Sequence, residues 1–559
     1  MTELMEEFGI QVDSRGWPLH ATPVAPLDLE RLDELAAGCD HATRRRWEKM
    51  SRWLKEPRMY RRVPNDDWSR RPPRTSKLDA QDMCTIEASK LSEELKPGQE
   101  PKGFVRTFPT PQPAKRRRRW INHTVSINDY AKKLPLSLPG LKNLRESLYD
   151  GSHAVALDMH QWFHQFILTE GVSMYMCYEQ TSPSHRDGTE ATETKVYRLT
   201  RLPMGMRQSC SIAQAALDVL TFGLRAIGYI DNVKITGTSE ECRRDCSEFL
   251  RRCKLIGATV NEESREPTEV VEYLGVRLDH EQKTISLGSK SVEKVMLCQA
   301  QLRIKPVITA GQLCSVMGVL FYVHWIYRST LGDTTMWHWR SMHAYSRAGR
   351  RLQAHPQAID EVFEISAEET KDILQWLHEA VNVGPAFVAN AASLDTTVLI
   401  TDASKKRWHG IVWDMCTGDL RECGGDFPQE EKSSVAAEPV AVIRASSSLL
   451  ARRDHYWRLL IATDHQSMLS SLEKGYSANP KYNRVVQHLR RQFPGAILQG
   501  MYLPGAYNPA DEGSRGEPTD QDKLQHAMRL ICQNGLTCQP VVIPLGTEES
   551  GSDSSGEED

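Results

Sequence analysis

The stretch Tyr229 to Val233, with the sequence YIDNV, constrains the fold of this chain more than any other. Largely apolar runs flank it at 222–227 and 233–235. Two β-prone runs around a short polar stretch predict a hairpin with Asp231 at its tip. Another apolar run, 73 residues upstream, ends in Asp158. Carboxylates on neighbouring strands of one sheet can bind Mg²⁺, which activates a hydroxyl nucleophile and stabilises a leaving phosphate.

The composition is that of a globular protein with several domains. A length of 559 residues, with 40% hydrophobic and 26% charged residues, predicts three or four domains. The net charge of −3 argues against a globally basic nucleic-acid binder. Basic residues gather instead in local runs, which matter more for phosphate contact than the total charge. These runs lie at 44–46, 61–62, 70–71 and 115–119, whereas the C-terminus is acidic.

The sequence predicts a cytoplasmic or nuclear protein. No apolar run approaches the ~20 residues of a membrane span, and the N-terminal residues MTELMEEFGI lack the pattern of a signal peptide. None of the 13 cysteines has the spacing Cys-x-x-Cys, which favours reduced thiols. A zinc site on Cys242, Cys246 and Cys253 is an alternative that we disfavour, because no histidine accompanies them.

The first 100 residues carry no catalytic signature. Residues 27–55 have helical periodicity, and their basic second half contains Trp47 and Trp53. Residues 57–76 are rich in Pro and Arg and contain Trp68. Arginines interleaved with aromatic residues suit a nucleic-acid surface. The favoured interpretation of residues 57–76 is nevertheless a solvated linker.

Polar and turn-forming motifs follow one another between the basic run at 115–119 and the hairpin. An alternating apolar stretch, 120–127, comes directly after the basic run, and Phe163 lies five residues beyond Asp158. The segment 202–209 contains Pro and Gly close together, which predicts a tight turn into a helix at 211–224. Further predicted elements are a helix at 240–255, the stretch 257–261, and the stretch 272–276 with the sequence EYLGV.

This order of motifs resembles the fingers and palm of retroelement reverse transcriptases. The matching motifs are the finger arginine, motif A, the Pro-x-Gly turn of motif B, the Tyr-x-Asp of motif C, motif D and the Tyr-Leu-Gly primer grip. The resemblance implies an RNA-directed DNA polymerase. It implies the following roles: Asp158 and Asp231 as Mg²⁺ ligands, Arg119 at the triphosphate, Phe163 as a gate against a 2′-hydroxyl, Gly205, Arg207 and Gln208 at the nascent pair and template, Tyr229 and Asn232 in motif C, and Tyr273, Leu274 and Gly275 as the primer grip.

Two positions depart from the family pattern. Asn232 stands where motif C has its second aspartate, so a neutral and weaker ligand replaces a carboxylate. Asn261 begins the stretch NEES, where the family's motif D has Asn-x-Lys, so the proposed general-acid lysine has no counterpart. A weakened polymerase is therefore an alternative.

Four further carboxylates recur in the last third of the chain. Apolar strands end in Asp402 and Asp464, and a return strand is predicted at 410–413. Glu438 lies in the first turn of a predicted helix, and Asp511 begins a final helix capped by the sequence NPAD. Four carboxylates cannot stay ionised at one point without cations, so two bridging Mg²⁺ ions are implied.

This second set resembles RNase H. The order is Thr-Asp-x-Ser, a helical Glu, Thr-Asp and Asn-x-Ala-Asp-x-x-Ser-Arg. The resemblance implies Asp402, Glu438, Asp464 and Asp511 as metal ligands, with room for a three-stranded meander between the first two. The family's histidine near the last aspartate has no counterpart, since Tyr507 and Asn508 occupy that loop.

Together the motifs predict an α/β multidomain chain: a right-hand polymerase with fingers, palm and thumb, followed by an RNase H-like mixed α/β domain. Expected partners are an RNA template, a DNA primer, an RNA–DNA hybrid and deoxynucleoside triphosphates, with Mg²⁺ or Mn²⁺ as cofactor and no membrane. The sequences of the motifs are closest to those of DIRS-like and gypsy-like elements and of the VIPER group. The alternatives are an RNase H with an inactive palm and a nucleic-acid-binding scaffold without activity.

The predicted segments are 1–100 (basic helical extension), 101–280 (fingers and palm), 281–390 (helical thumb and connection, with helices at 291–302 and 309–322), 391–520 (RNase H) and 521–559 (C-terminal segment with a disordered acidic tail).

We predict that Phe163→Ala relaxes discrimination against ribonucleotides, because removal of the ring opens space for a 2′-hydroxyl. The ratio of ribonucleotide to deoxyribonucleotide incorporation in primer extension measures this. An unchanged ratio would remove Phe163 from the role of gate.

Overall fold

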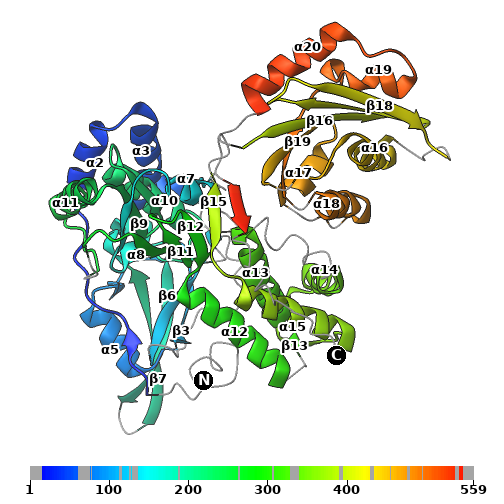
Figure 1. The fold of residues 1–559 in the computed structure, drawn as a ribbon. Coiled ribbons are helices and arrows are strands. Elements are labelled where there is room, and N and C mark those ends of the chain that lie inside the picture. Colours follow the sequence, from blue (N-terminus) through cyan, green and yellow to red (C-terminus); the bar gives the residue numbers. More distant parts are fainter. Residues whose placement is uncertain are drawn as a thin grey trace, which may run out of the picture. The chain divides into compact units, whose positions relative to one another are not determined.

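The chain is a mixed α/β protein, as predicted, and it divides into two compact units, Met1–Leu274 and Gly275–Asp559 (Figure 1). The computed structural model describes residues 16–60, 76, 78–112, 116–124, 127–128, 136–186, 189–261, 265–304, 308–327, 339–389, 394–428, 434–453, 455–474, 477, 479–493, 495–535 and 541–544. Several features of the sequence therefore lie outside the described residues: Trp68, the basic pairs at 61–62 and 70–71, residues 262–264 and the acidic tail.

A three-stranded antiparallel sheet of order β5-β9-β8 carries the predicted hairpin of the first unit. Its strands are β5 (His153–Asp158), β9 (Asn232–Gly237) and β8 (Ala226–Tyr229). Asp158 and Tyr229 both lie opposite Asn232, from either side. The predicted hairpin and the predicted neighbouring strand are thus confirmed.

Two helices pack on this sheet, α10 (Ser209–Thr221) and α11 (Ser239–Leu255). The predicted helix at 211–224 was placed slightly too late. It ends at Thr221 because Gly223 adopts a positive φ of 74°, which a helix does not allow. Thr238 caps α11 in a reciprocal capping box with Glu241.

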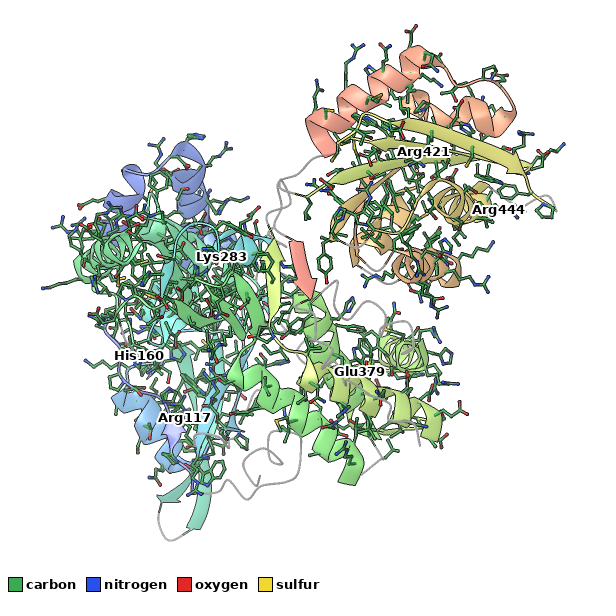
Figure 2. All side chains as sticks on the ribbon, viewed as in Figure 1. Arg117, His160, Lys283, Glu379, Arg421 and Arg444 are labelled. Carbon is green, nitrogen blue, oxygen red and sulfur yellow. The ribbon has the colours of Figure 1, made fainter. Side chains whose placement is uncertain are left out.

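Two further sheets complete the first unit. One joins β2 (Ser92–Glu94), β7 (Thr189–Leu199) and β6 (Cys177–Arg186). The other joins β1 (Leu19–His20), β4 (Arg117–His123) and β3 (Arg106–Gln112). The second carries the basic run, whose Arg117 is labelled in Figure 2, and places His20 opposite Arg119.

The helical stretch near the N-terminus consists of two helices, α2 (Leu29–Ala37) and α3 (His41–Lys55), where one was predicted. Gly38 ends the first, and the Asp40 side chain caps the second. Trp47 and Trp53 are 0% and 2% exposed, in the same hydrophobic core as β5 and β9. The nucleic-acid surface suggested for these two tryptophans is therefore wrong, because both rings are used in packing.

Helices dominate the first part of the second unit: α12 (Ser289–Ile304), α13 (Ala310–Tyr327), α14 (Trp339–Ala354) and α15 (Ala367–Asn382). Thr309 accepts a hydrogen bond from the Gln312 N–H at 3.2 Å, which confirms the predicted N-cap. Trp376 is a core residue, as predicted, with 1% exposure. By length and composition α13 is the one described helix that could cross a membrane, but half of it is buried in the protein among its neighbouring helices.

A five-stranded sheet of order β18-β17-β16-β19-β20 forms the last large layer. The first three strands form the predicted antiparallel meander, and β19 and β20 add in parallel. Residues alternate along β16: Leu399 packs in a core with α16 to α18, whereas Val398 and Ile400 pack in one with α20 (Figure 1). The strands are β16 (Thr396–Ala403), β17 (Arg407–Asp414), β18 (Leu420–Asp426), β19 (Trp457–Thr463) and β20 (Ala496–Tyr502). The helices are α16 (Ser434–Leu449), α17 (Gln466–Lys474), α18 (Pro480–Gln492), α19 (Ala510–Arg515) and α20 (Gln521–Leu530).

Two details of this layer differ from the prediction. Glu438 lies in the second turn of α16, because the helix already includes Ser434. The helix after the sequence NPAD, α19, is not the last one, since α20 follows it.

The remaining elements are η1 (Pro57–Met59), α5 (Ala80–Ala88), α7 (Leu141–Glu146), α8 (Trp162–Gln165), α9 (Glu170–Ser173), β10 (Val270–Tyr273), β11 (Val276–Asp279), β12 (Thr284–Leu287), β13 (Ile308–Thr309), η3 (Pro356–Asp360), β14 (Val362–Phe363), β15 (Ala386–Ala389), η5 (Gly505–Tyr507), η6 (Ile531–Gly535) and β21 (Val541–Pro544).

A lysine is fully buried in the first unit. Lys234 on β9 is 0% exposed and donates a hydrogen bond to the Ser147 hydroxyl. Burial lowers the pKa of Lys234 to about 7. Because this value lies below the ordinary lysine pKa, the unfolded chain binds more protons than the folded chain between pH 7 and pH ~10. The contribution of Lys234 to stability therefore falls as the pH falls through that window.

We predict that Lys234→Met stabilises the first unit by about 2 kcal/mol at pH 7. Ser147 keeps a partner, because its hydroxyl also donates to the Leu144 carbonyl. The gain should shrink between pH 7 and pH 9, where the native lysine loses its proton. Urea unfolding at both pH values measures this. A gain that is absent, or equal at both, contradicts the burial argument.

Candidate active sites

The sheet of the first unit brings Asp158 and Asp231 together. Asp158 ends β5, and Asp231 lies in the two-residue turn between β8 and β9. The Met159 N–H donates to the Asp231 carbonyl at 2.7 Å, which ties the two segments to each other. Burial, followed by the charge of Asp158, raises the pKa of Asp231 above its ordinary value. The two carboxylates therefore interact, as their placement at strand ends predicted.

The turn that carries Asp231 is strained and is held from α10. Ile230 has a φ of 57°, a region that a β-branched residue rarely adopts. The Gln214 side chain accepts from the Ile230 N–H at 2.8 Å and donates to the Gly228 carbonyl at 3.0 Å. No sequence signal distinguishes Gln214, because the helical pattern marks it only as one position of α10.

Asn232 is a hydrogen-bond donor to its neighbour. Its Nδ2 donates to Asp231 Oδ1 at 2.8 Å. This bond favours the ionised carboxylate and opposes the effect of burial on the Asp231 pKa. The Asn232 amide therefore orients the Asp231 carboxylate and favours its ionised form.

Tyr273 packs against the hairpin formed by β8 and β9. Its hydroxyl lies 2.9 Å from the Ile227 carbonyl and 3.2 Å from the Asn232 carbonyl, and the residue is 3% exposed. The side chain predicted to grip a primer is thus buried against the strands of the hairpin. Leu274 and Gly275, in the turn that follows, both have positive φ values of 51° and 74°.

The residues expected around the nascent pair lie in different settings. Arg119 on β4 is exposed, and its charge favours the ionised form of Asp231, against the larger effects of burial and Asp158. Arg207 is exposed, but Gln208 is fully buried and cannot face a template as predicted. Phe163 is 8% exposed within the core, and Tyr229 is half-buried on β8.

Asn128 fixes the turn before α10. Its Nδ2 donates to the Gly205 carbonyl at 2.9 Å, and its Oδ1 accepts from the Arg207 N–H at 2.8 Å. A Cβ at Gly205 would lie 2.5 Å from the Asn122 carbonyl on β4, so only glycine allows this approach. The glycine predicted to approach a base pair therefore also packs against the strand that carries Arg119.

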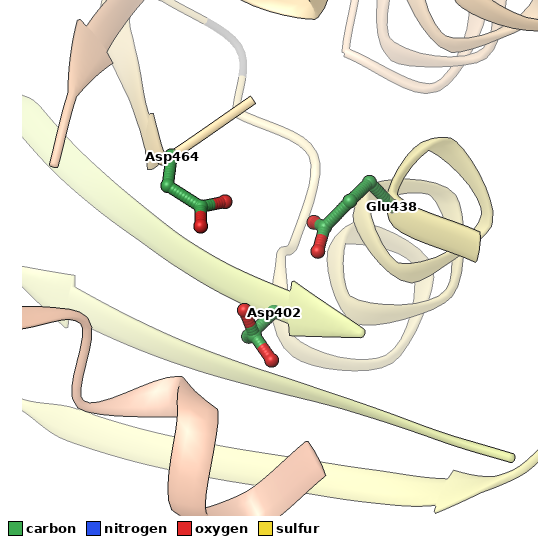
Figure 3. Close-up of side chains that lie close together, drawn as sticks. All are labelled: Asp402, Glu438 and Asp464. Atoms are coloured by element: carbon green, nitrogen blue, oxygen red, sulfur yellow. The ribbon is translucent and has the colours of Figure 1, made fainter. Parts of the chain in front are cut away.

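Three carboxylates converge in the second unit. Ligand atoms of Asp402, Glu438 and Asp464 lie within 4.8 Å of one another, from the ends of two strands and from α16 (Figure 3). Asp402 and Glu438 are buried, whereas Asp464 is exposed. Burial and the neighbouring carboxylates raise the pKa of Asp402 to about 6 and that of Glu438 to about 9.

Asp511 lies at the rim of the same hollow. The hollow measures about 410 Å³ and is lined by Asp402, Glu438, Asp464, His465, Asp511, Ser514 and Arg515, among others. Asp511 is not part of the close trio and forms an ion pair with Arg515 at 2.8 Å. All four predicted carboxylates therefore face one hollow, three of them closely.

Neutral donors hold Asp402 in place. The Ser514 hydroxyl donates to Asp402 Oδ2 at 2.5 Å, and Asn508 Nδ2 donates to the Thr401 carbonyl at 3.0 Å and to Asp402 Oδ1 at 3.5 Å. Both donors belong to the NPADEGSR sequence, which the sequence analysis used only as a motif. Glu438 Oε1 accepts from the Ala403 N–H at 3.0 Å.

The trio fits a divalent cation. Glu438 Oε2 is buried and has no hydrogen-bond partner among the described residues. A buried acceptor without a donor is costly, and a bound cation would satisfy it while it neutralises the crowded carboxylates. Oxygen ligands of this kind suit Mg²⁺ or Mn²⁺. By contrast, Cys242, Cys246 and Cys253 are buried with raised thiol pKa values, which does not fit the zinc alternative.

Comparison with known proteins gives similarity to solved structures only. No family model matches the sequence. No curated protein matches it either. Among solved structures, the foamy viral protease–reverse transcriptase in complex with an RNA/DNA hybrid matches at 13% identity and a TM-score of 0.44, covering 85% of this chain and 63% of that one. Two of its complexes with double-stranded DNA also match, each with a TM-score of 0.43. One is 12% identical and covers 86% of this chain and 83% of that chain. The other is 14% identical and covers 87% of this chain and 99% of that chain.

We predict that Mg²⁺ stabilises the second unit locally and that Glu438→Gln removes this effect. A cation at a hundred times its Kd adds about 2.7 kcal/mol to the stability of a site that it binds only when folded. Hydrogen exchange of peptides from β16 and α16, with and without Mg²⁺, measures this. Asp419→Asn, which changes an exposed carboxylate of the same unit, should keep the full effect. Equal protection in Glu438→Gln would contradict a metal site at the trio.

Proposed function

We propose that this protein is an RNA-directed DNA polymerase with RNase H activity. It would copy an RNA template from a DNA primer with deoxynucleoside triphosphates, and cleave the RNA of the resulting hybrid. The observation that carries the proposal is the trio Asp402, Glu438 and Asp464 at the end of a sheet of order β18-β17-β16-β19-β20. The pair Asp158 and Asp231 in the first unit supports the polymerase part.

In the second unit each residue has a distinct task. Asp402, held on both oxygens by Ser514 and Asn508, is the fixed member of the set, and Glu438 supplies a buried oxygen with no other partner. Asp464 is exposed and faces the entering strand. Bound Mg²⁺ would lower the pKa of the attacking group and stabilise the leaving oxygen at both sites.

In the first unit the tasks follow from exposure and charge. Asp158 and Asp231 would hold the cations and orient the primer 3′-hydroxyl. Exposed Arg119, whose charge reaches Asp231, would bind the triphosphate. The exposed turn around Gly205 and Arg207 would contact the nascent pair. A relation to DIRS-like or gypsy-like elements, or to the VIPER group, belongs to the proposal on the sequences of the motifs alone. A cytoplasmic or nuclear location belongs to it on the spacing of the cysteines, which favours reduced thiols.

A second candidate is an RNase H whose polymerase palm is weakened. Asn232 favours it, because the amide stands in the place of a carboxylate and leaves two carboxylates in the first unit against four in the second. A scaffold without activity is disfavoured, because buried carboxylates such as Glu438 cost stability without a cation.

We predict that the two activities separate by mutation. Asp231→Ala should reduce primer extension at least about a thousandfold, or about 4 kcal/mol, and spare RNA cleavage. Asp402→Asn should abolish RNA cleavage and spare extension. Primer extension on RNA and cleavage of an RNA–DNA hybrid, each with Mg²⁺ and then Mn²⁺, measure both.

The variant Asn232→Asp distinguishes the two candidates. Extension by the native chain supports the polymerase. Extension only after Asn232→Asp supports the weakened palm with an active RNase H. Neither extension nor cleavage by any variant would reject both.

A further inference from the structure

A continuous chain of hydrogen bonds runs from a buried histidine to Asp158. His164 Nδ1 lies 3.2 Å from Gln161 Oε1, and Gln161 Nε2 lies 3.2 Å from His160 Nε2. His160 Nδ1 lies 2.8 Å from Asn261 Oδ1, and Asn261 Nδ2 lies 2.8 Å from Asp158 Oδ2. His160 is labelled in Figure 2. We call these four residues, His164, Gln161, His160 and Asn261, the relay.

With the amide oxygen and nitrogen atoms placed as in the structure, one assignment of protons satisfies every bond of the relay. An ionised carboxylate only accepts, so Asn261 donates to Asp158 through Nδ2 and must accept through Oδ1. His160 therefore carries its proton on Nδ1, and its Nε2 accepts from the Gln161 amide nitrogen. Gln161 Oε1 in turn accepts from the Nδ1–H of His164. In this assignment every donor of the relay points toward Asp158.

The environment of His164, at the far end of the relay, favours the neutral imidazole that this arrangement needs. His164 is nine-tenths buried. Burial, followed by electrostatic effects of His20, Arg201 and Arg119, lowers the pKa of His164 to about 4. At neutral pH it is therefore the neutral donor that the relay requires.

Backbone bonds keep the two strands of the relay in register. The Asn261 N–H donates to the Asp158 carbonyl at 2.9 Å, and the His160 N–H donates to the Thr259 carbonyl at 3.0 Å. Fully buried Gln165 bridges the same segments, because its Nε2 donates to the His160 and Thr259 carbonyls and its Oε1 accepts from the Thr259 N–H. The relay residues are thus placed by the fold, independently of any ligand.

We propose that Asn261 is a positioning residue for Asp158 and that His160 and Gln161 align it. The amide holds one Asp158 oxygen and so sets the direction in which the carboxylate would face a cation. Mg²⁺ demands near-ideal geometry from its ligands, so the orientation of a single carboxylate matters. The inference rests on the proposed polymerase function, and it assigns a task to Asn261 at the position where the resemblance would lead one to expect motif D. None of the relay residues needs to touch substrate.

The first test is kinetic. Asn261→Ala and His160→Ala should each lower kcat for primer extension at least about tenfold and change KM for the nucleotide less than about threefold. His160→Asn should retain most of the activity, because an amide nitrogen can take the place of Nδ1. Mn²⁺, which tolerates irregular ligands better than Mg²⁺, should restore part of the loss in Asn261→Ala.

The double variant tests whether the relay acts through Asn261. If His160 only aligns Asn261, then His160→Ala adds no further loss to Asn261→Ala. Additive losses would contradict the relay. His153→Ala, at the other end of β5, is the matched control and should keep full extension. RNA cleavage by each preparation, which depends on the second unit, reports whether the chain is folded.

A metal titration separates the relay from the polymerase proposal. In the background Asp402→Asn and Asp464→Asn, Mn²⁺ binding followed by paramagnetic resonance reports on the first unit. Asn261→Ala should weaken that binding about tenfold. If the native chain extends no primer, the polymerase proposal is wrong, and this titration still decides the relay. Unchanged Mn²⁺ affinity in Asn261→Ala overturns the relay, even where the native chain extends primers normally.

Discussion

Repulsion between carboxylates that the fold holds together is the constraint on which both candidate sites depend. In the second unit burial, followed by the charges of Asp402 and Asp464, raises the pKa of Glu438 to about 9. In the first unit the repulsion acts between Asp158 and Asp231. A lysine or arginine side chain could relieve such repulsion, but its fixed positive charge would exclude a metal ion from the site. Here neutral donors meet carboxylates of both sites, namely Asp402, Glu438, Asp231 and Asp158, and orient them without cancelling their charge.

Side-chain amides supply most of these donors. Asn232 donates to Asp231, Asn261 to Asp158 and Asn508 to Asp402. An amide has both a donor and an acceptor, so it can hold a carboxylate with one end and be held itself by the other. Gln214 does this for the strained turn at Ile230. Asp511, at the rim, is the member of the set that pairs with an arginine, Arg515.

This view changes the meaning of Asn232, which departs from the reverse transcriptase pattern, and of Asn261, which begins the stretch that lacks the lysine of that pattern. Asn232 and Asn261 are both hydrogen-bonded to the candidate metal ligands. At Asn232 the loss of a charge relative to the reverse transcriptase pattern is thus coupled to a hydrogen bond that orients Asp231. The number of carboxylates in the first unit is small, and the geometry of each one is correspondingly more important.

The sequence alone determined the carboxylates, the strands that end in them and the meander before α16, because alternation and turn signals are local properties of the chain. It could not determine what covers a residue. Trp47, Trp53 and Gln208 proved to be buried because distant segments pack over them, and Tyr273 lies under a hairpin 41 residues away in sequence. Nor could it reveal that Asn261 holds Asp158 from 103 residues away. Only the tertiary structure decided these partners, because a hydrogen bond depends on which segments meet, and periodicity carries no information about that.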